Sequence, residues 1–118
     1  YKGSVIAGRS WGAPMQVMNL PEAVKNSWEY LLHSAGAGDR LVLMDDLVNR
    51  DMFMENHIGH RAVGVVYNPL NEAFGNYVPS ILPLRYDAFI HLDESMALHP
   101  LHILPHWTQI PETYPFGV

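Results

Sequence analysis

The sequence contains no cysteine. This absence excludes a disulfide framework and any thiol chemistry. It suits the reducing cytoplasm, and we expect a cytoplasmic protein, although a chain without cysteine is compatible with either redox compartment.

Basic residues are scarce, and no apolar run is long. The chain has 7 lysines and arginines against 12 acidic residues, a formal net charge of -5, and no basic cluster. A nucleic-acid backbone or an anionic membrane would attract such a cluster, so we expect neither nucleic acid nor a membrane as partner. No stretch approaches the roughly 20 apolar residues of a membrane-spanning helix, and the first residues lack the layout of a signal peptide. A small or neutral partner fits better.

Several catalytic signatures are also missing. No serine stands in a G-x-S-x-G context, and the phosphate-binding patterns G-x-G-x-x-G and G-x-x-x-x-G-K-S/T do not occur. The sequence therefore shows no complete catalytic machinery, and we expect no cofactor.

What the chain does have is enough apolar material for one core: 118 residues, 48% of them hydrophobic. Apolar runs bounded by turn residues predict five strands, at Ser4–Ala7, Met15–Met18, Leu41–Met44, Ala62–Tyr67 and Asp87–Leu92. Runs without polar alternation are typical of strands covered on both faces. We predict an α/β fold with a helix-flanked, mostly buried, mixed or parallel sheet.

The connections include two helices and one long loop. Ser27 is expected to cap a short helix with Trp28, Leu31 and Leu32 at i, i+3, i+4 spacing, and a second helix is predicted over Asp46–Glu55. Asn71–Pro83, rich in glycine and proline, is predicted to be a long irregular connection, which in an ordered protein tends to be functional.

The ends of the chain suggest a larger whole. The first residue is tyrosine, and Ser4–Ala7 resembles the middle of a βα unit whose partner precedes it. We therefore expect the C-terminal section of a larger α/β domain, with residues 1–95 as the α/β part. Residues 96–118 contain four prolines and are predicted to form an extended C-terminal arm.

Polar residues follow several of the predicted strands. If the strands are parallel, their carboxyl ends meet at one rim, where open α/β sheets bind ligands. The residues expected to converge there are Arg9, Trp11, Asp45, Asn68 and Asp93. An aspartate at a strand end also often caps the next turn, and that alternative stays open for each acidic residue. Aromatic residues in the same loops, such as Tyr77, suit a pocket wall or the edge of the core equally well.

Histidine is the remaining candidate for chemistry. His99, His102 and His106 have a spacing that can ligate zinc, but the prolines between them break any helix that would bring three rings to one face. Half-exposed tail residues are the simpler interpretation. His57 and His60, at a helix-to-strand junction, are assigned a structural role near a helix C-terminus. His91 is predicted to be a hydrogen-bonded histidine of the core or of a sheet face.

Long segments of the chain resemble a known family. The segments SVIAGRSWGAPMQVMNLPEAVKNSWEYLLH, GDRLVLM, HRAVGVVYNPLNEAFGNYVPSILPLRYDAFIHLDES and ALHPLH resemble, in order and spacing, the C-terminal part of erythromycin esterase-like proteins, which are related to antibiotic resistance. The resemblance extends to about His102.

The resemblance implies metal-independent hydrolysis of an ester or lactone by a water molecule that a histidine activates. The implied catalytic residues belong to the part of the family upstream of this chain, so none is assigned here, and the chain alone is expected to be inactive. Arg9, Trp11, Asn68 and Tyr77 are assigned to the wall of a cleft for a small-molecule ester.

Two alternatives remain from the residues alone. The chain can be a non-catalytic binding or assembly module that buries an apolar sheet face against a second copy, as a homo-oligomer, or against an upstream part of the same protein. It can also be a small zinc-binding protein that uses the tail histidines.

Overall fold

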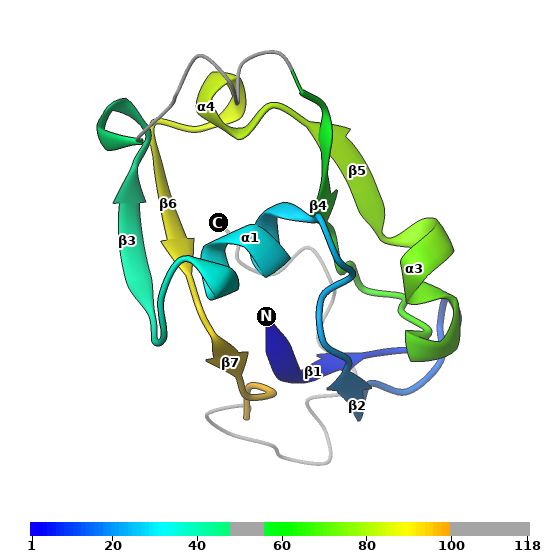
Figure 1. Ribbon diagram of the computed structural model, residues 1–118. Helices are drawn as coiled ribbons and strands as arrows, with labels where there is room; N and C mark the ends of the chain where they lie inside the picture. The colour runs from blue at the N-terminus through cyan, green and yellow to red at the C-terminus, as the bar shows by residue number, and fades with distance from the viewer. Residues whose placement is uncertain (48–55, 100–118) are drawn as a thin grey trace.

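The computed structural model describes residues 1–47 and 56–99 (Figure 1). These residues form short elements joined by tight connections. In chain order the elements are β1 (Lys2–Ala7), β2 (Gln16–Leu20), α1 (Trp28–Ser34), β3 (Arg40–Leu43), the 3-10 helix η1 (Met44–Asp46), β4 (Ile58–Arg61), the 3-10 helix η2 (Pro69–Asn71), α3 (Glu72–Gly75), β5 (Tyr77–Ser80), α4 (Leu82–Arg85), β6 (Ala88–His91) and β7 (Glu94–Ser95). None of the described helices has the length and apolar character needed to cross a membrane.

The strands form three small sheets. The first is mixed and has the order β2-β1-β7, in which β1 runs antiparallel to β2 and parallel to β7. The other two are antiparallel pairs, β3 with β6 and β4 with β5. In Figure 1 the three sheets surround α1, which lies near the middle of the view. The predicted α/β class with a mixed sheet is therefore confirmed.

Two apolar clusters lie beneath these sheets. One is built on the first sheet and consists of Ala7, Met18, Leu20 and Tyr67. The other joins α1, η1 and α4 through Trp28, Met44 and Leu82. The indole Nε1 of Trp28 donates a 2.9 Å hydrogen bond to the Ser80 carbonyl oxygen, so the ring is fixed in orientation as well as buried.

Helix α1 begins where the sequence predicts it. The Ser27 side-chain oxygen accepts a hydrogen bond from the Tyr30 backbone N–H, so Ser27 is the N-cap residue. The strands predicted at Ser4–Ala7, Met15–Met18, Leu41–Met44 and Asp87–Leu92 correspond to β1, β2, β3 and β6, with ends shifted by a few residues. The helix predicted over Asp46–Glu55 lies mostly outside the described residues.

The strand predicted at Ala62–Tyr67 is wrong. The strand in this part of the chain is β4, which ends at Arg61, and within Ala62–Tyr67 only Val66 forms an isolated bridge, with Gly8. The reason is that β4 finds an antiparallel partner in β5, whereas the apolar run that follows pairs only at separate points, through Ala62 with Asn76 and through Val65 and Tyr67 with Gly8. Val65 is accordingly 57% exposed. An apolar run therefore becomes a strand only where another strand can pair with it along its length.

The predicted irregular connection Asn71–Pro83 is also wrong in detail. It contains the short helix α3, the strand β5 and the first residues of α4. Pro79 lies within β5, opposite Gly59 of β4. A proline is tolerated there because β5 pairs on one side only, so its missing N–H can face away from the partner strand.

The β3–β6 pair has one covered and one bare face. Val42 and Phe89 face the inner cluster and are packed against it. Leu41 and Ile90, which are paired in register, are 64% and 70% exposed on the other face. Among the described residues nothing covers this outer face.

Candidate functional site

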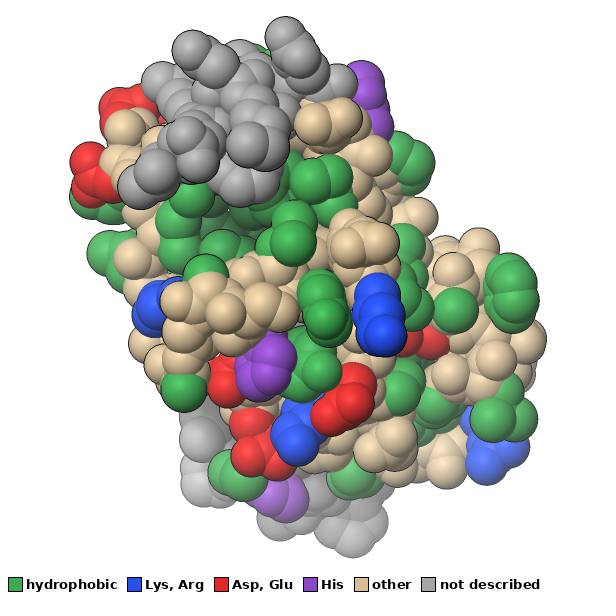
Figure 2. Space-filling view, viewed as in Figure 1, with side chains coloured by type: hydrophobic (Ala, Val, Ile, Leu, Met, Phe, Trp, Pro, Cys, Tyr) green, Lys and Arg blue, Asp and Glu red, His purple; other side chains and the backbone are tan. Residues whose placement is uncertain are grey.

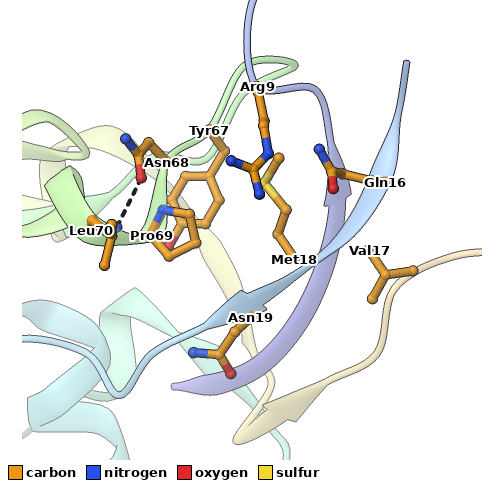
Figure 3. A pocket seen from close by; sticks show the side chains of 9 residues that line it. All are labelled: Arg9, Gln16, Val17, Met18, Asn19, Tyr67, Asn68, Pro69 and Leu70. Atoms are coloured by element: carbon orange, nitrogen blue, oxygen red, sulfur yellow. Dashed lines mark hydrogen bonds between the residues drawn. The ribbon is translucent and has the colours of Figure 1, made fainter. Parts of the chain in front are cut away.

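A pocket of about 520 Å³ opens between β2 and the turn that follows Tyr67 (Figure 3). Its size is within the range of small-molecule sites. Polar side chains and apolar side chains contribute to its wall, which consists of Arg9, Gln16, Val17, Met18, Asn19, Tyr67, Asn68, Pro69 and Leu70.

Backbone pairing just beyond the end of β1 brings the two halves of this wall together. The Gly8 N–H donates to the Val65 carbonyl oxygen at 2.8 Å, and the Tyr67 N–H donates to the Gly8 carbonyl oxygen at 3.0 Å. These two bonds hold the end of β1 against the segment before η2. Arg9 and Asn68, the residues that follow on each side, therefore lie at the same pocket.

Local chemistry then orients Asn68. Its side-chain oxygen accepts a 3.0 Å hydrogen bond from the Leu70 backbone N–H and caps η2, while Pro69 occupies the first helical position, where no N–H is needed. In Figure 3 the amide nitrogen of Asn68 faces away from Leu70, and the side chain of Arg9 extends between Tyr67 and Gln16 toward Met18.

Two of the four predicted wall residues thus lie at the pocket, and two do not. Trp11 is 83% exposed and does not line the pocket. The Tyr77 side chain is engaged elsewhere, because its hydroxyl accepts hydrogen bonds from the Val24 N–H and from Arg61 Nε, both at 3.1 Å. Burial raises the pKa of Tyr77 above its ordinary value.

Tyr77 belongs to a buried polar network behind the pocket. Arg61 Nε lies 2.6 Å from Glu72 Oε1, and both side chains are almost fully buried. The guanidinium group of Arg61 also donates to the carbonyl oxygens of Tyr1 and Pro21. The network therefore ties β4, α3 and the end of β2 together, and β2 is one of the elements that line the pocket.

The floor of the pocket carries a phenol that stays neutral. Tyr67 is 2% exposed. Burial raises the pKa of its hydroxyl well above the ordinary value, and the neighbouring carboxylate of Glu72 acts in the same direction. Tyr67 therefore presents an uncharged ring to the pocket at any physiological pH.

A second cluster pairs a carboxylate with a histidine, away from the pocket. His60 Nδ1 lies 2.6 Å from Glu29 Oε2, and His60 Nε2 lies 3.1 Å from the Tyr86 hydroxyl. The Arg61 N–H donates to the other Glu29 oxygen. Burial alone would raise the pKa of Glu29, but these hydrogen bonds outweigh it and lower the pKa. His60 therefore contacts Glu29 of α1, whereas the sequence placed it against a helix C-terminus, and its structural role stays a prediction.

A third cluster centres on Asp93. His33 Nδ1 lies 2.7 Å from Asp93 Oδ1, and His91 Nε2 lies 3.2 Å from the same atom. The hydrogen bond from His33 is the main reason that the pKa of Asp93 falls to about 2. His91 is buried and hydrogen-bonded, so its prediction is confirmed. On the face of the molecule that Figure 2 shows, acidic and basic side chains lie next to a histidine in the lower half of the view.

The predicted convergence of Asp45 and Asp93 on the rim with Arg9 is wrong. It required parallel strands, but β3 and β6 are antiparallel, with Arg40 opposite His91. Asp93, two residues beyond the end of β6, therefore lies at the start of β3, where its N–H donates to the Asp39 side chain. Asp45 lies at the other end of the pair.

A metal site is found nowhere in residues 1–47 and 56–99, where no group of three or more potential ligands is close enough to hold an ion. Of the three histidines in the zinc hypothesis, only His99 is described. His102 and His106 lie outside the described residues, so the hypothesis stays a prediction.

Sequence reasoning missed Glu29, Arg61 and Glu72, which are all charged and all buried. A charged residue inside an apolar helical pattern, as Glu29 is between Trp28 and Leu32, is a usable signal because burial of a charge requires a partner. No sequence pattern points to His60 as that partner, since the two residues lie on separate elements.

The described residues thus form an α/β protein with a mixed sheet and a partly polar pocket of small-molecule size. Comparison with known families places it further: the erythromycin esterase family model matches residues 1–95, and the chain belongs to that family. No solved structure matches the chain.

Proposed function

We propose that this chain is the C-terminal section of an erythromycin esterase-like hydrolase, in which activated water cleaves an ester or a lactone. One observation carries the proposal, namely the family match over residues 1–95. In this proposal the water-activating residues belong to another part of the intact protein, and the chain contributes sheet strands and one wall of the substrate cleft.

The pocket supports the role of a wall. Arg9 and Asn68 come from distant parts of the sequence and line one cavity of suitable size. The described residues that line it include no histidine, carboxylate, serine or threonine, and the one hydroxyl, that of Tyr67, has a raised pKa, so this lining suits binding rather than bond cleavage. Trp11 remains a proposed wall residue, while Tyr77 is proposed to act from behind the wall through Arg61 and Glu72.

The test uses the intact protein that contains this chain. Esters and lactones, erythromycin among them, are incubated with the enzyme, and mass spectrometry detects the addition of one water. We expect Arg9→Ala and Asn68→Ala to raise KM severalfold with little change in kcat, because a wall residue binds substrate and transition state alike.

Arg85→Ala is the matched control, since Arg85 lines a separate, more open pocket of about 370 Å³. Its KM should equal that of the wild type. Absence of hydrolysis for every ester and lactone would refute the hydrolase proposal, whereas unchanged KM values in both pocket variants would refute the wall alone.

A second candidate function is favoured by the bare outer face of the β3–β6 pair. Leu41, Leu43 and Ile90 are all exposed there, and an exposed apolar sheet face often marks an interface. In this alternative the chain is a non-catalytic assembly module, and a second copy covers the face.

A further inference from the structure

We propose that the pocket between β2 and residues 67–70 binds a small organic oxyanion with an apolar body, and that Arg9 pairs with its charge. Nothing in the family match assigns this ligand class. The inference rests on the proposed function in one respect: hydrolysis of an ester yields such a molecule. Water oxygen bonds to the acyl carbon, the acyl C–O bond breaks, the alcohol leaves with a proton, and the acid releases its own proton as a carboxylate.

The first argument is the charge of Arg9. Within the described part of the chain Arg9 has no hydrogen bond and no ion pair. Arg61, by contrast, is paired with Glu72, and Arg85 donates to the Ser80 hydroxyl. None of the described residues that line the pocket is a carboxylate, although the chain as a whole carries a formal net charge of -5. The pocket therefore holds a positive charge that no lining residue neutralises.

The second argument is the set of hydrogen-bond donors. The Asn68 side-chain oxygen is occupied by the Leu70 N–H, so its amide NH₂ is the group left to interact with a ligand. Gln16 and Asn19 contribute further amides from β2. Arg9 is the donor of charge-assisted hydrogen bonds, which are stronger than neutral ones, and the amides on the same wall add neutral donors.

The third argument concerns the apolar part of the wall. Met18 and Tyr67 are buried and form an apolar floor, while Val17 and Leu70 remain 61% and 88% exposed beside it. Because burial and Glu72 raise the pKa of Tyr67, its hydroxyl carries no charge that would repel an anion. The floor and the exposed side chains can cover an alkyl or aryl body, as in most small-molecule sites.

The experiment measures binding of three probes to the intact protein by saturation-transfer NMR and calorimetry. The probes are hexanoate, hexyl phosphate and methyl hexanoate, which share an alkyl body and differ in the head group. We expect hexanoate or hexyl phosphate to bind about tenfold more tightly than the uncharged ester, which corresponds to one charge-assisted contact. Whichever anion binds more tightly identifies the oxyanion as a carboxylate or a phosphate.

Arg9→Gln should weaken binding of the preferred anion about tenfold and leave binding of methyl hexanoate unchanged. Lys2→Gln is the matched control, since it removes an exposed cation of β1 outside the pocket, and should bind as the wild type does. The inference is overturned if neither anion binds, if the ester binds as tightly as both anions, or if Arg9→Gln binds the anions normally.

The same variant separates this inference from the proposed function. If Arg9→Gln loses anion binding while KM for ester hydrolysis stays normal, the oxyanion site is supported and the role of Arg9 in the substrate wall is refuted. If KM rises while the affinity for the anions is unchanged, the role of Arg9 in the substrate wall is supported and the oxyanion site is refuted.

Discussion

At the scale of single residues, Asp93 is the clearest source of pH-dependent stability. Its pKa falls from 3.8 to about 2, mainly because of the hydrogen bond from His33. The folded chain therefore binds the Asp93 proton more weakly than the unfolded chain does. The stabilisation is fully present above pH 3.8 and is lost as the pH falls through about 2.

We expect Asp93→Asn to lower the melting temperature at pH 7 and to flatten its decline between about pH 4 and about pH 2. Circular dichroism melts of both proteins across this range measure the effect. Since the other carboxyl groups titrate in both proteins, only the difference between the curves reports on Asp93. Parallel curves would show that His33 does not stabilise the Asp93 carboxylate.

Arg40 differs from Asp93, because it is a charged residue whose buried atoms form no hydrogen bond within the described part of the chain. Its Nε and Nη2 atoms are buried and find no hydrogen-bond partner among residues 1–47 and 56–99. Unsatisfied buried donors cost about 1–3 kcal/mol, so we expect Arg40→Met, which keeps the aliphatic stem, to leave the free energy of unfolding unchanged or higher. Urea unfolding measures it, and Lys2→Met is the exposed control. A loss of about 2 kcal/mol or more would mean that the guanidinium group has a stabilising contact.

At the scale of elements, the Arg61–Glu72 pair joins β4 to α3. Both side chains are nearly inaccessible to water, and the shortest distance between them is 2.6 Å. Removing one partner leaves the other charge buried and unpaired, which typically costs about 3–5 kcal/mol. Removing both charges at once avoids that penalty.

We therefore expect Glu72→Met and Arg61→Met each to destabilise the protein by about 3–5 kcal/mol, and the double variant to lose clearly less than the sum of the two. Denaturant unfolding of all four proteins forms a double-mutant cycle. Strictly additive losses would mean that the two side chains stabilise the fold independently.

The parallel pairing of β1 with β7 depends on Gly3. Its φ angle is +135°, and a Cβ atom there would overlap the backbone of Ser95. We expect Gly3→Ala to weaken the docking of β7 and to lower the free energy of unfolding by about 2 kcal/mol or more, through backbone strain and steric overlap. Thermal unfolding measures the loss.

Gly64→Ala is the matched control for this substitution. A Cβ atom at position 64 would meet nothing within 4 Å, and its φ is not in the positive range. The change in unfolded-state entropy is the same in both variants, so only Gly3→Ala should destabilise. Equal effects of the two substitutions would contradict the role of the close approach to Ser95.

At the scale of the whole molecule, the bare β3–β6 face decides between a monomer and an assembly. We expect Leu41→Thr combined with Ile90→Thr to keep the fold, because threonine suits a strand and both side chains point outward. If a second copy covers this face, multi-angle light scattering will show a larger mass for the wild type than for the double variant. A wild-type monomer would refute the assembly alternative.

Local patterns in the sequence predicted much of the fold. The Ser27 cap and the apolar spacing of Trp28 and Leu32 were sufficient for α1. Short apolar runs located β1, β2, β3 and β6 because side-chain periodicity and turn residues act within a few positions of each other. The same reasoning failed at Ala62–Tyr67, since pairing with a distant strand, and not local propensity, decides whether an extended segment becomes a strand.

Part of the candidate site could likewise be predicted from local sequence, and part could not. Arg9 and Asn68 were identifiable from sequence as polar residues that follow short apolar runs, but their meeting at one pocket depends on hydrogen bonds between Gly8 and residues 65–67. The parallel rim failed because strand direction is a property of the pairing, and Asp45 and Asp93 lie at opposite ends of an antiparallel pair.

The sequence by itself determined the α/β class, the capped helix α1, most strand positions and the resemblance to the family that the comparison shows. These properties depend on residues that are close together in the chain, or on the order of segments along it. Only the tertiary structure decided which charges are buried together, which strands are antiparallel, and which side chains share a pocket. Those outcomes depend on contacts between distant segments, and no spacing within one segment encodes the partner that the rest of the chain supplies.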